Sequence, residues 1–152
     1  MYGPASAATL PSRPVPSAAE LREEACAAAD SLTQSLVVPP GCALAATGSF
    51  ARRAMTPFSD LDLILLHPEG TTLSSEVVSE VWYPIWDAKY RLDYAVRTPS
   101  EFAAIAGSDP AAGFAQLDLA YVAGDKQLVD STRAQVYACL LYTSDAADEG
   151  LG

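Results

Sequence analysis

The chain has 152 residues, a formal net charge of −10 and a pI near 4.3, with nine Lys and Arg residues in all. Its length fits one domain, because domains commonly have about 100–200 residues. The acidic balance excludes a basic surface for a nucleic-acid backbone. The three cysteines lack CxxC spacing, and together with a single histidine they exclude a standard zinc site. A small anionic ligand remains compatible, since one or two cationic side chains and a metal ion can hold a triphosphate.

The hydrophobic spacing predicts a series of helices and strands. A flexible Pro-rich tail is expected at 1–16. The elements predicted after it, in chain order, are a capped helix at 17–38, a buried strand at 42–47, a short helix at 50–55, a strand at 60–66, a helix at 75–88, a strand at 90–97, helix starts at 98–101 and 109–110, and a last helix from about 125. We expect the large aromatic residues among them to be core or packing residues, namely Trp82, Tyr83, Trp86 and Phe114.

The N-terminal and C-terminal segments of the chain lead to separate predictions. The start has no charged segment followed by an apolar one, and no apolar run approaches the roughly 18 residues of a membrane span. We therefore expect a cytoplasmic protein without membrane or nucleic-acid partners. Residues 139–152 look like the translation of a sequencing-library adapter, which predicts a non-native tail and a native protein that continues further. A genuine frayed C-terminus is the alternative.

The most informative pattern is Gly48-Ser49, followed after ten residues by Asp60-Leu61-Asp62. Alternation along a strand places both acids on one face, with Cα atoms about 7 Å apart. Both carboxylates can then bind a common divalent cation. Gly48 allows a ligand to approach the backbone closely, and amides at the start of the next helix can face a phosphate. The pattern predicts metal and phosphate sites at one end of two neighbouring strands.

A third acid would complete a site for phosphoryl transfer, in which metal ions neutralise charge and align the reacting groups. Asp93 is the best candidate because it lies on the separate strand 90–97, on the same face as Arg97. The alternatives stay open: an Asp-x-Asp pair can be a solvated strand edge. Arg52, Arg53 and Lys89 can contact phosphates or simply occupy a surface helix.

At these residues the sequence resembles the DNA polymerase β-like nucleotidyltransferase superfamily, whose signature is Gly-Ser or Gly-Gly, a spacer, and acid-apolar-acid. It is more narrowly similar, over about 41–135, to the N-terminal domain of the protein-PII uridylyltransferase/uridylyl-removing enzymes. The residues that carry this resemblance are Ala46-Thr47-Gly48-Ser49, Arg52, Pro57-Phe58-Ser59-Asp60-Leu61-Asp62-Leu63, Trp86-Asp87-Ala88, Val96-Arg97-Thr98 and Ala123-Gly124-Asp125. It implies an α+β nucleotidyltransferase fold, a small mixed β-sheet flanked by α-helices, with its core at 41–138.

The resemblance also implies an activity: transfer of UMP or AMP from UTP or ATP to a tyrosine of the nitrogen-regulatory protein PII, with release of pyrophosphate and with Mg²⁺ as cofactor. The predicted catalytic and metal-binding acids are Asp60, Asp62 and Asp93. The predicted nucleotide-binding residues are Gly48, Ser49, Arg52 and Ser59.

The sequence departs from the family pattern at three places. An acid is replaced at Ala54, the family's Gly-His-Ser before Val-Arg-Thr becomes Asp93-Tyr94-Ala95, and an arginine expected near Ala120 is absent. Two alternatives therefore stay open. One is a nucleotidyltransferase for another acceptor, and the other is an inactive nucleotide-binding or regulatory module.

Overall fold

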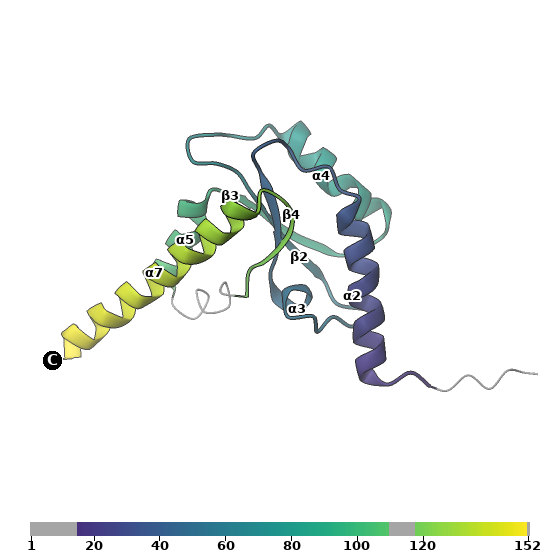
Figure 1. Cartoon of the computed structure of the whole chain (residues 1–152), viewed down its shortest axis with the longest axis horizontal. Helices are drawn as coiled ribbons and strands as arrows, with labels where there is room; N and C mark the ends of the chain where they lie inside the picture. The colour runs from purple at the N-terminus through teal and green to yellow at the C-terminus, as the bar shows by residue number, and fades with distance from the viewer. Residues whose placement is uncertain (1–14, 110–117, 152) are drawn as a thin grey trace, which may run out of the picture.

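The computed structural model describes residues 15–109 and 118–151 (Figure 1). Its elements are α2 (Ala18–Gln34), β1 (Ala43–Ala46), α3 (Gly48–Ala51), β2 (Leu61–Leu66), α4 (Ser75–Asp87), β3 (Leu92–Arg97), α5 (Pro99–Ser108), β4 (Ala120–Gly124) and α7 (Lys126–Leu151). The predicted helix start at 109–110 and the predicted packing of Phe114 lie outside the described residues. Within the described ranges, no helix is both long and apolar enough to cross a membrane.

The four strands form one mixed sheet in the order β3-β2-β1-β4. Strand β1 pairs antiparallel with β2 and β4, and β2 pairs parallel with β3. This confirms the expected α+β fold with a small mixed sheet. Strand β4 is an addition to the elements expected from the sequence. It ends at Gly124, which has a φ of +86°, and a Cβ added there would lie 2.5 Å from the Cys42 carbonyl oxygen, so a side chain has no room.

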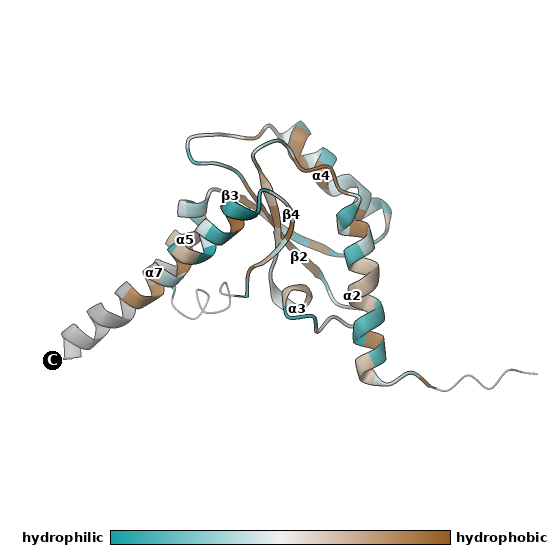
Figure 2. Ribbon diagram, in the orientation of Figure 1, coloured by the Kyte–Doolittle hydropathy of each residue, from teal (hydrophilic) through white to brown (hydrophobic). Residues whose placement is uncertain are grey.

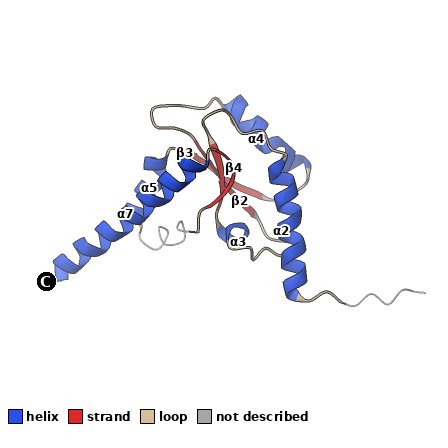
Figure 3. Cartoon of the chain, viewed as in Figure 1, coloured by secondary structure: helices blue, strands red, loops and turns tan. Residues whose placement is uncertain are grey.

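Helices cover both faces of the sheet, as Figures 1 and 3 show. Side chains of β2 alternate between the two faces of the sheet, so this strand contributes to two separate hydrophobic cores. Leu61, Leu63 and Leu65 face the core that contains Cys26 of α2 and Trp82 of α4, and Leu66 faces the core of α5 and α7. These strands form the apolar centre of the molecule (Figure 2). Fully burying one leucine stabilises the fold by about 1.5–3 kcal/mol, so β2 anchors both layers.

Helix α2 begins where its cap predicts and ends earlier than expected. The Ser17 hydroxyl accepts a hydrogen bond from the Glu20 amide at 3.1 Å. The helix stops at Gln34 rather than near residue 38. The Ser35 and Leu36 amides donate to the Leu32 and Thr33 carbonyl oxygens, three residues back, so the last turn tightens and the helix ends there.

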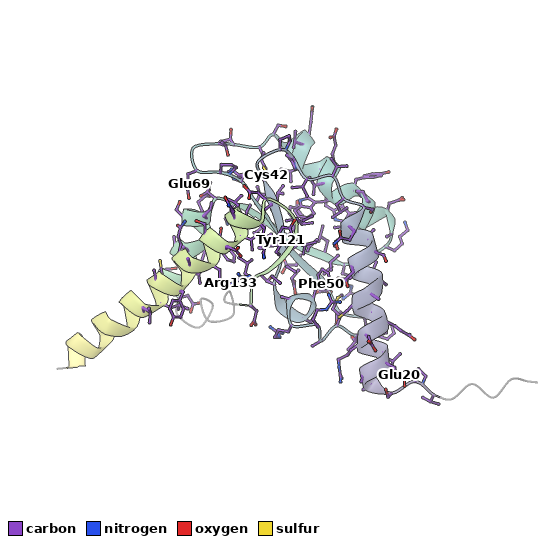
Figure 4. The ribbon with its side chains drawn as sticks, viewed as in Figure 1. Glu20, Cys42, Phe50, Glu69, Tyr121 and Arg133 are labelled. Atoms are coloured by element: carbon purple, nitrogen blue, oxygen red, sulfur yellow. The ribbon has the colours of Figure 1, made fainter. Side chains whose placement is uncertain are left out.

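The short helix after β1 also differs from expectation. It spans Gly48–Ala51 as a single turn, whereas the sequence predicts 50–55. Arg53 ends it, because its φ of +58° is incompatible with a continuing right-handed helix. Phe50, labelled in Figure 4, packs from this turn into the core beneath α2.

The aromatic residues of α4 only partly follow the prediction. Trp82 is fully buried, and its ring centroid lies 5.1 Å from that of Tyr94. Trp86 is 41% exposed but makes an edge-on contact with Tyr94. Tyr83 is 65% exposed, so it is not a core residue. Successive residues of a helix are about 100° apart, and Trp82 already occupies the face toward the sheet.

The N-terminus of α5 gives a test of local stability. Thr98 and Glu101 form a capping box, and the hydrogen bonds from Thr98 hold the pKa of Glu101 below its usual range. We expect Thr98→Ala to lower the free energy of unfolding by about 1 kcal/mol, because it leaves the Glu101 amide without its acceptor. Urea denaturation measures this change. Glu101→Gln is the control, since it keeps the side chain's reach and should cost less. Equal stability of Thr98→Ala and the parent chain would contradict the cap's contribution.

The C-terminal end of α7 gives a second test. Leu140 is 4% exposed in the core beside α5, whereas Leu141 is 49% exposed. The expectation that 139–152 form a non-native tail stays a prediction. We expect removal of 142–152 to change the free energy of unfolding by less than about 0.5 kcal/mol. Leu140→Ala should lower it by about 2 kcal/mol. Thermal unfolding of both variants measures these changes. A large loss of stability from the truncation alone would show that the tail stabilises the fold.

Candidate active site

The glycine turn and the first strand acid lie in direct contact. Strands β1 and β2 run antiparallel, and the Thr47 amide donates a hydrogen bond to the Asp62 carbonyl at 3.1 Å. The next residue, Gly48, has a φ of +65°. A Cβ atom at Gly48 would lie 2.4 Å from Asp62 Oδ2. The backbone at the start of α3 therefore lies against the Asp62 carboxylate, and a side chain at position 48 would displace that carboxylate.

Asp93 lies beside Asp62 on the neighbouring strand. The parallel register of β2 and β3 makes these two residues direct partners. Residues paired in this way project from the same sheet face, with Cα atoms about 4.8 Å apart. Asp60 directly precedes β2 and is exposed. The structure therefore brings Gly48, Asp62 and Asp93 together, with Asp60 at the rim.

The electrostatics of Asp62 reflect this crowding. Burial raises the pKa of its carboxyl above the ordinary value, and the negative charges of Asp93 and Asp60 raise it further. The positive charge of Arg52 acts in the opposite direction. Like charges held this close disfavour ionisation unless a cation neutralises them. The site is therefore short of positive charge.

A divalent cation suits this charge imbalance chemically. Carboxylate oxygens are the ligands that Mg²⁺ prefers, and Mg²⁺ often binds through one or two carboxylates together with phosphate oxygens. Across residues 15–109 and 118–151, however, no three His, Cys, Asp or Glu side chains already share a metal-coordinating arrangement. The observations that fit a cation are the in-register acid pair and the raised pKa of Asp62.

The two arginines after α3 point to different partners. Arg52 pairs with Asp118 at 3.1 Å, and both side chains are substantially exposed. Its positive charge acts to lower the pKa of Asp62. Arg53 pairs with Asp30 of α2 at 2.6 Å. The charge of Arg52 thus reaches the acids while its side chain is paired with Asp118, whereas Arg53 fixes the turn to α2. The sequence reasoning did not identify Asp118, because 66 residues separate it from Arg52.

The two predicted serines also separate. Ser49 lies in the first turn of α3, next to Gly48, and is half-buried. Ser59 accepts a hydrogen bond from the Thr56 amide at 2.8 Å, which closes a tight turn. Ser59 also lines a cavity of about 620 Å³ that opens between α2 and the loops before β2 and β3. Its hydroxyl is therefore engaged in the turn and is not among the groups gathered at Asp62.

This arrangement can bind a metal-bound polyphosphate. Acids on two adjacent strands offer oxygen ligands, the glycine turn allows close backbone approach, and one arginine adds positive charge at the rim. Sites of this composition act by positioning and by neutralising the charge of a transferring phosphoryl group.

Comparison with known proteins agrees with this chemistry. The family described as "Nucleotidyltransferase domain" matches residues 34–111. The bifunctional uridylyltransferase/uridylyl-removing enzyme of Corynebacterium glutamicum is 53% identical over 118 residues, 78% of this chain and 17% of that protein. The same-named enzyme of Mycobacterium tuberculosis is 42% identical over 100 residues, 62% of this chain and 12% of that protein. That of Streptomyces coelicolor is 38% identical over 99 residues, 64% of this chain and 12% of that protein.

A crystal structure described as a toxin-antitoxin with AMP-PNP has a TM-score of 0.48 at 12% identity, covering 84% of this chain and 98% of that one. The chain spans less than a fifth of the length of the three curated relatives. The family match covers about half of the 152 residues and includes the glycine turn and all three acids. The resemblance to uridylyltransferases is confirmed, and the chain belongs to the nucleotidyltransferase domain family.

Proposed function

We propose that this domain transfers UMP or AMP from UTP or ATP onto a tyrosine hydroxyl of the signalling protein PII in the cytoplasm, with release of pyrophosphate. The observation that supports it most is the placement of Asp62 beside Asp93 and against Gly48. The name shared by the three relatives, which includes uridylyltransferase, supports the type of reaction.

In this reaction the tyrosine oxygen attacks the α-phosphorus, the bond from that phosphorus to the bridging oxygen breaks, and pyrophosphate leaves. The hydroxyl proton passes to a base or to water. Asp60, Asp62 and Asp93 would hold Mg²⁺, which when bound supplies charge neutralisation and alignment of the phosphates. The backbone at Gly48 and Ser49 would cradle the triphosphate, and Arg52 would add positive charge beside it.

The test is transfer of labelled nucleotide. The chain is incubated with PII, Mg²⁺ and labelled UTP or ATP, and the label on PII is followed over time. We expect transfer by the parent chain and none by the Asp60→Ala, Asp62→Ala double variant. Glu80→Ala, which replaces an exposed acid within α4, is the control and should retain activity. No transfer by the parent chain, or undiminished transfer by the double variant, would refute the proposal.

The replaced acid at Ala54 favours a second candidate, a domain that binds nucleotide without transferring it. Ala54 is exposed, and its amide donates a hydrogen bond to the Ser49 carbonyl at 2.8 Å. Calorimetry that shows Mg²⁺-dependent nucleotide binding without turnover would favour this candidate. Mass spectrometry of other acceptors would identify a different substrate.

A further inference from the structure

The cavity of about 620 Å³ beside α2, which we name the α2 groove, lies outside the acid site. Its walls come from α2 and from the two loops that lead into β2 and β3. The residues that line it are Leu21, Glu24, Ala25, Ala28, Met55, Thr56, Pro57, Phe58, Ser59, Ala88, Lys89, Tyr90 and Arg91. This volume lies within the range of roughly 300–1,000 Å³ that is common for binding sites.

One wall of the α2 groove is cationic. Lys89 and Arg91 are both exposed, and neither belongs to an ion pair in the described parts of the chain. Glu24 is the only acid among the lining residues, so the groove carries a local excess of positive charge on a chain whose net charge is −10. This charge is complementary to a carboxylate on a partner.

The other wall is apolar, and an exposed aromatic side chain borders it. Leu21, Ala25 and Met55 line it, and Met55 is fully buried. Phe58 stands at the lip with 91% of its surface exposed. An aromatic ring that stays in water on the free surface and borders a groove gains most when a partner covers it.

The backbone at Lys89 adds a further observation. Lys89 follows the end of α4 with a φ of +66°, a conformation that favours glycine. Its amide donates to the Trp86 carbonyl and the Tyr90 amide donates to the Ile85 carbonyl, so the turn itself needs no lysine side chain. A charged side chain therefore occupies a position where the backbone alone would favour glycine.

The α2 groove and the acid site share the same two loops. Ser59 lines the groove and Asp60 follows it, and Arg91 lies two residues before Asp93. The Leu61 amide donates to the Arg91 carbonyl at 2.8 Å, which holds the two loops together. Ser59 is three residues from Asp62, so at about 3.3 Å per residue the near end of the groove lies at most roughly 10 Å from Asp62 along the chain. A protein seated in the groove can therefore place a loop at the acids.

We infer that the α2 groove docks the acceptor protein, through a segment that carries an apolar side chain beside one or more carboxylates. This inference rests on the proposed function. The apolar wall and Phe58 receive the apolar side chain, and Lys89 and Arg91 receive the carboxylates. The groove thereby holds the acceptor while its tyrosine reaches the acid site.

The test measures PII binding, magnesium–nucleotide binding and nucleotide transfer separately on the full chain. We expect the Lys89→Glu, Arg91→Glu double variant to weaken PII binding at least tenfold, to raise the KM for PII, and to leave the Kd for magnesium–ATP unchanged. Lys126→Glu, a single charge reversal at the start of α7 and away from the groove, is the control and should behave as the parent chain. Phe58→Ala should weaken PII binding about tenfold.

Lys89→Gly separates the ammonium group from the fold. We expect it to raise the melting temperature, because glycine adopts the positive φ readily, and yet to weaken PII binding. A variant that is more stable and still binds PII less well excludes misfolding as the cause.

Each remaining outcome is decisive. Transfer to PII that is unaffected in the double variant overturns the docking site and leaves the proposed function intact. Groove-dependent PII binding without any transfer overturns the proposed function and leaves the docking site intact. Loss of nucleotide binding in the double variant overturns the docking site and assigns the groove to the nucleotide. Absence of both PII binding and nucleotide transfer in the parent chain overturns both proposals.

Discussion

Asp62→Asn should lower the rate of nucleotide transfer by roughly 10³-fold or more, as expected when a ligand of a catalytic metal ion loses its charge. Asparagine keeps the shape of the side chain, so the strand and its contact with Gly48 should persist. The measurement is the initial rate of labelled nucleotide transfer to PII at saturating Mg²⁺. A rate within tenfold of the parent chain would contradict a role for Asp62 at the reacting phosphate.

The same substitution should raise the stability of the metal-free chain at neutral pH. The folded-state pKa of Asp62 lies above its unfolded value, mainly because of burial and then because of Asp93 and Asp60. Folding therefore disfavours the ionised form. This cost is absent below the ordinary pKa of 3.8 and develops as the pH rises through the raised folded value.

The asparagine side chain of the Asp62→Asn variant carries no charge at any pH. The stability advantage of this variant should therefore be present at pH 7–8 and vanish below about pH 4. Thermal unfolding across this range measures the effect. Added Mg²⁺ should then stabilise the parent chain more than the variant. A variant that is less stable than the parent at pH 7 would contradict the account of Asp62 as a crowded, disfavoured charge.

Gly48→Ala should reduce both activity and stability. The new Cβ would lie 2.4 Å from Asp62 Oδ2, and the positive φ of +65° strains any L side chain. We expect a loss of about 1–2 kcal/mol from the backbone alone. Displacement of the carboxylate should lower transfer by roughly 10²-fold, because small misplacements near the chemistry are costly.

Gly70→Ala is the matched control for this prediction. Gly70 also has a positive φ, +76°, but no atom lies within 4 Å of the Cβ that alanine would add. It should therefore show the backbone loss without the loss of activity. Urea denaturation and transfer rates of both variants are compared. Equal activities of the two variants would show that contact between Gly48 and Asp62 has no functional importance.

The sequence was sufficient for features that depend on local periodicity. The alternation of β2 correctly separates Leu61, Leu63 and Leu65 from Asp62, and the capped starts of α2 and α5 appear where Ser17 and Thr98 predict them. These features depend on neighbours within a few residues. That is why a single sequence carries enough information for them.

Features that depend on long-range pairing could not be obtained this way. The register that sets Asp62 opposite Asp93 comes from the pairing of β2 with β3, and β4 is a short edge strand with weak alternation. The ion pair of Arg53 with Asp30 and the turn that engages Ser59 were equally hidden, because isolated Arg, Asp and Ser residues are common on surfaces.

The central claim is that Asp62 and Asp93, lying against the Gly48 turn, form a metal-dependent phosphate site. Calorimetric titration of a non-hydrolysable ATP or UTP analogue tests it most directly, with and without Mg²⁺, into the parent chain and into the Asp62→Asn, Asp93→Asn double variant. The account predicts binding by the parent chain only when Mg²⁺ is present, and at least tenfold weaker binding by the double variant. Equal affinities for the two chains, or binding by the parent chain that is indifferent to Mg²⁺, would contradict it.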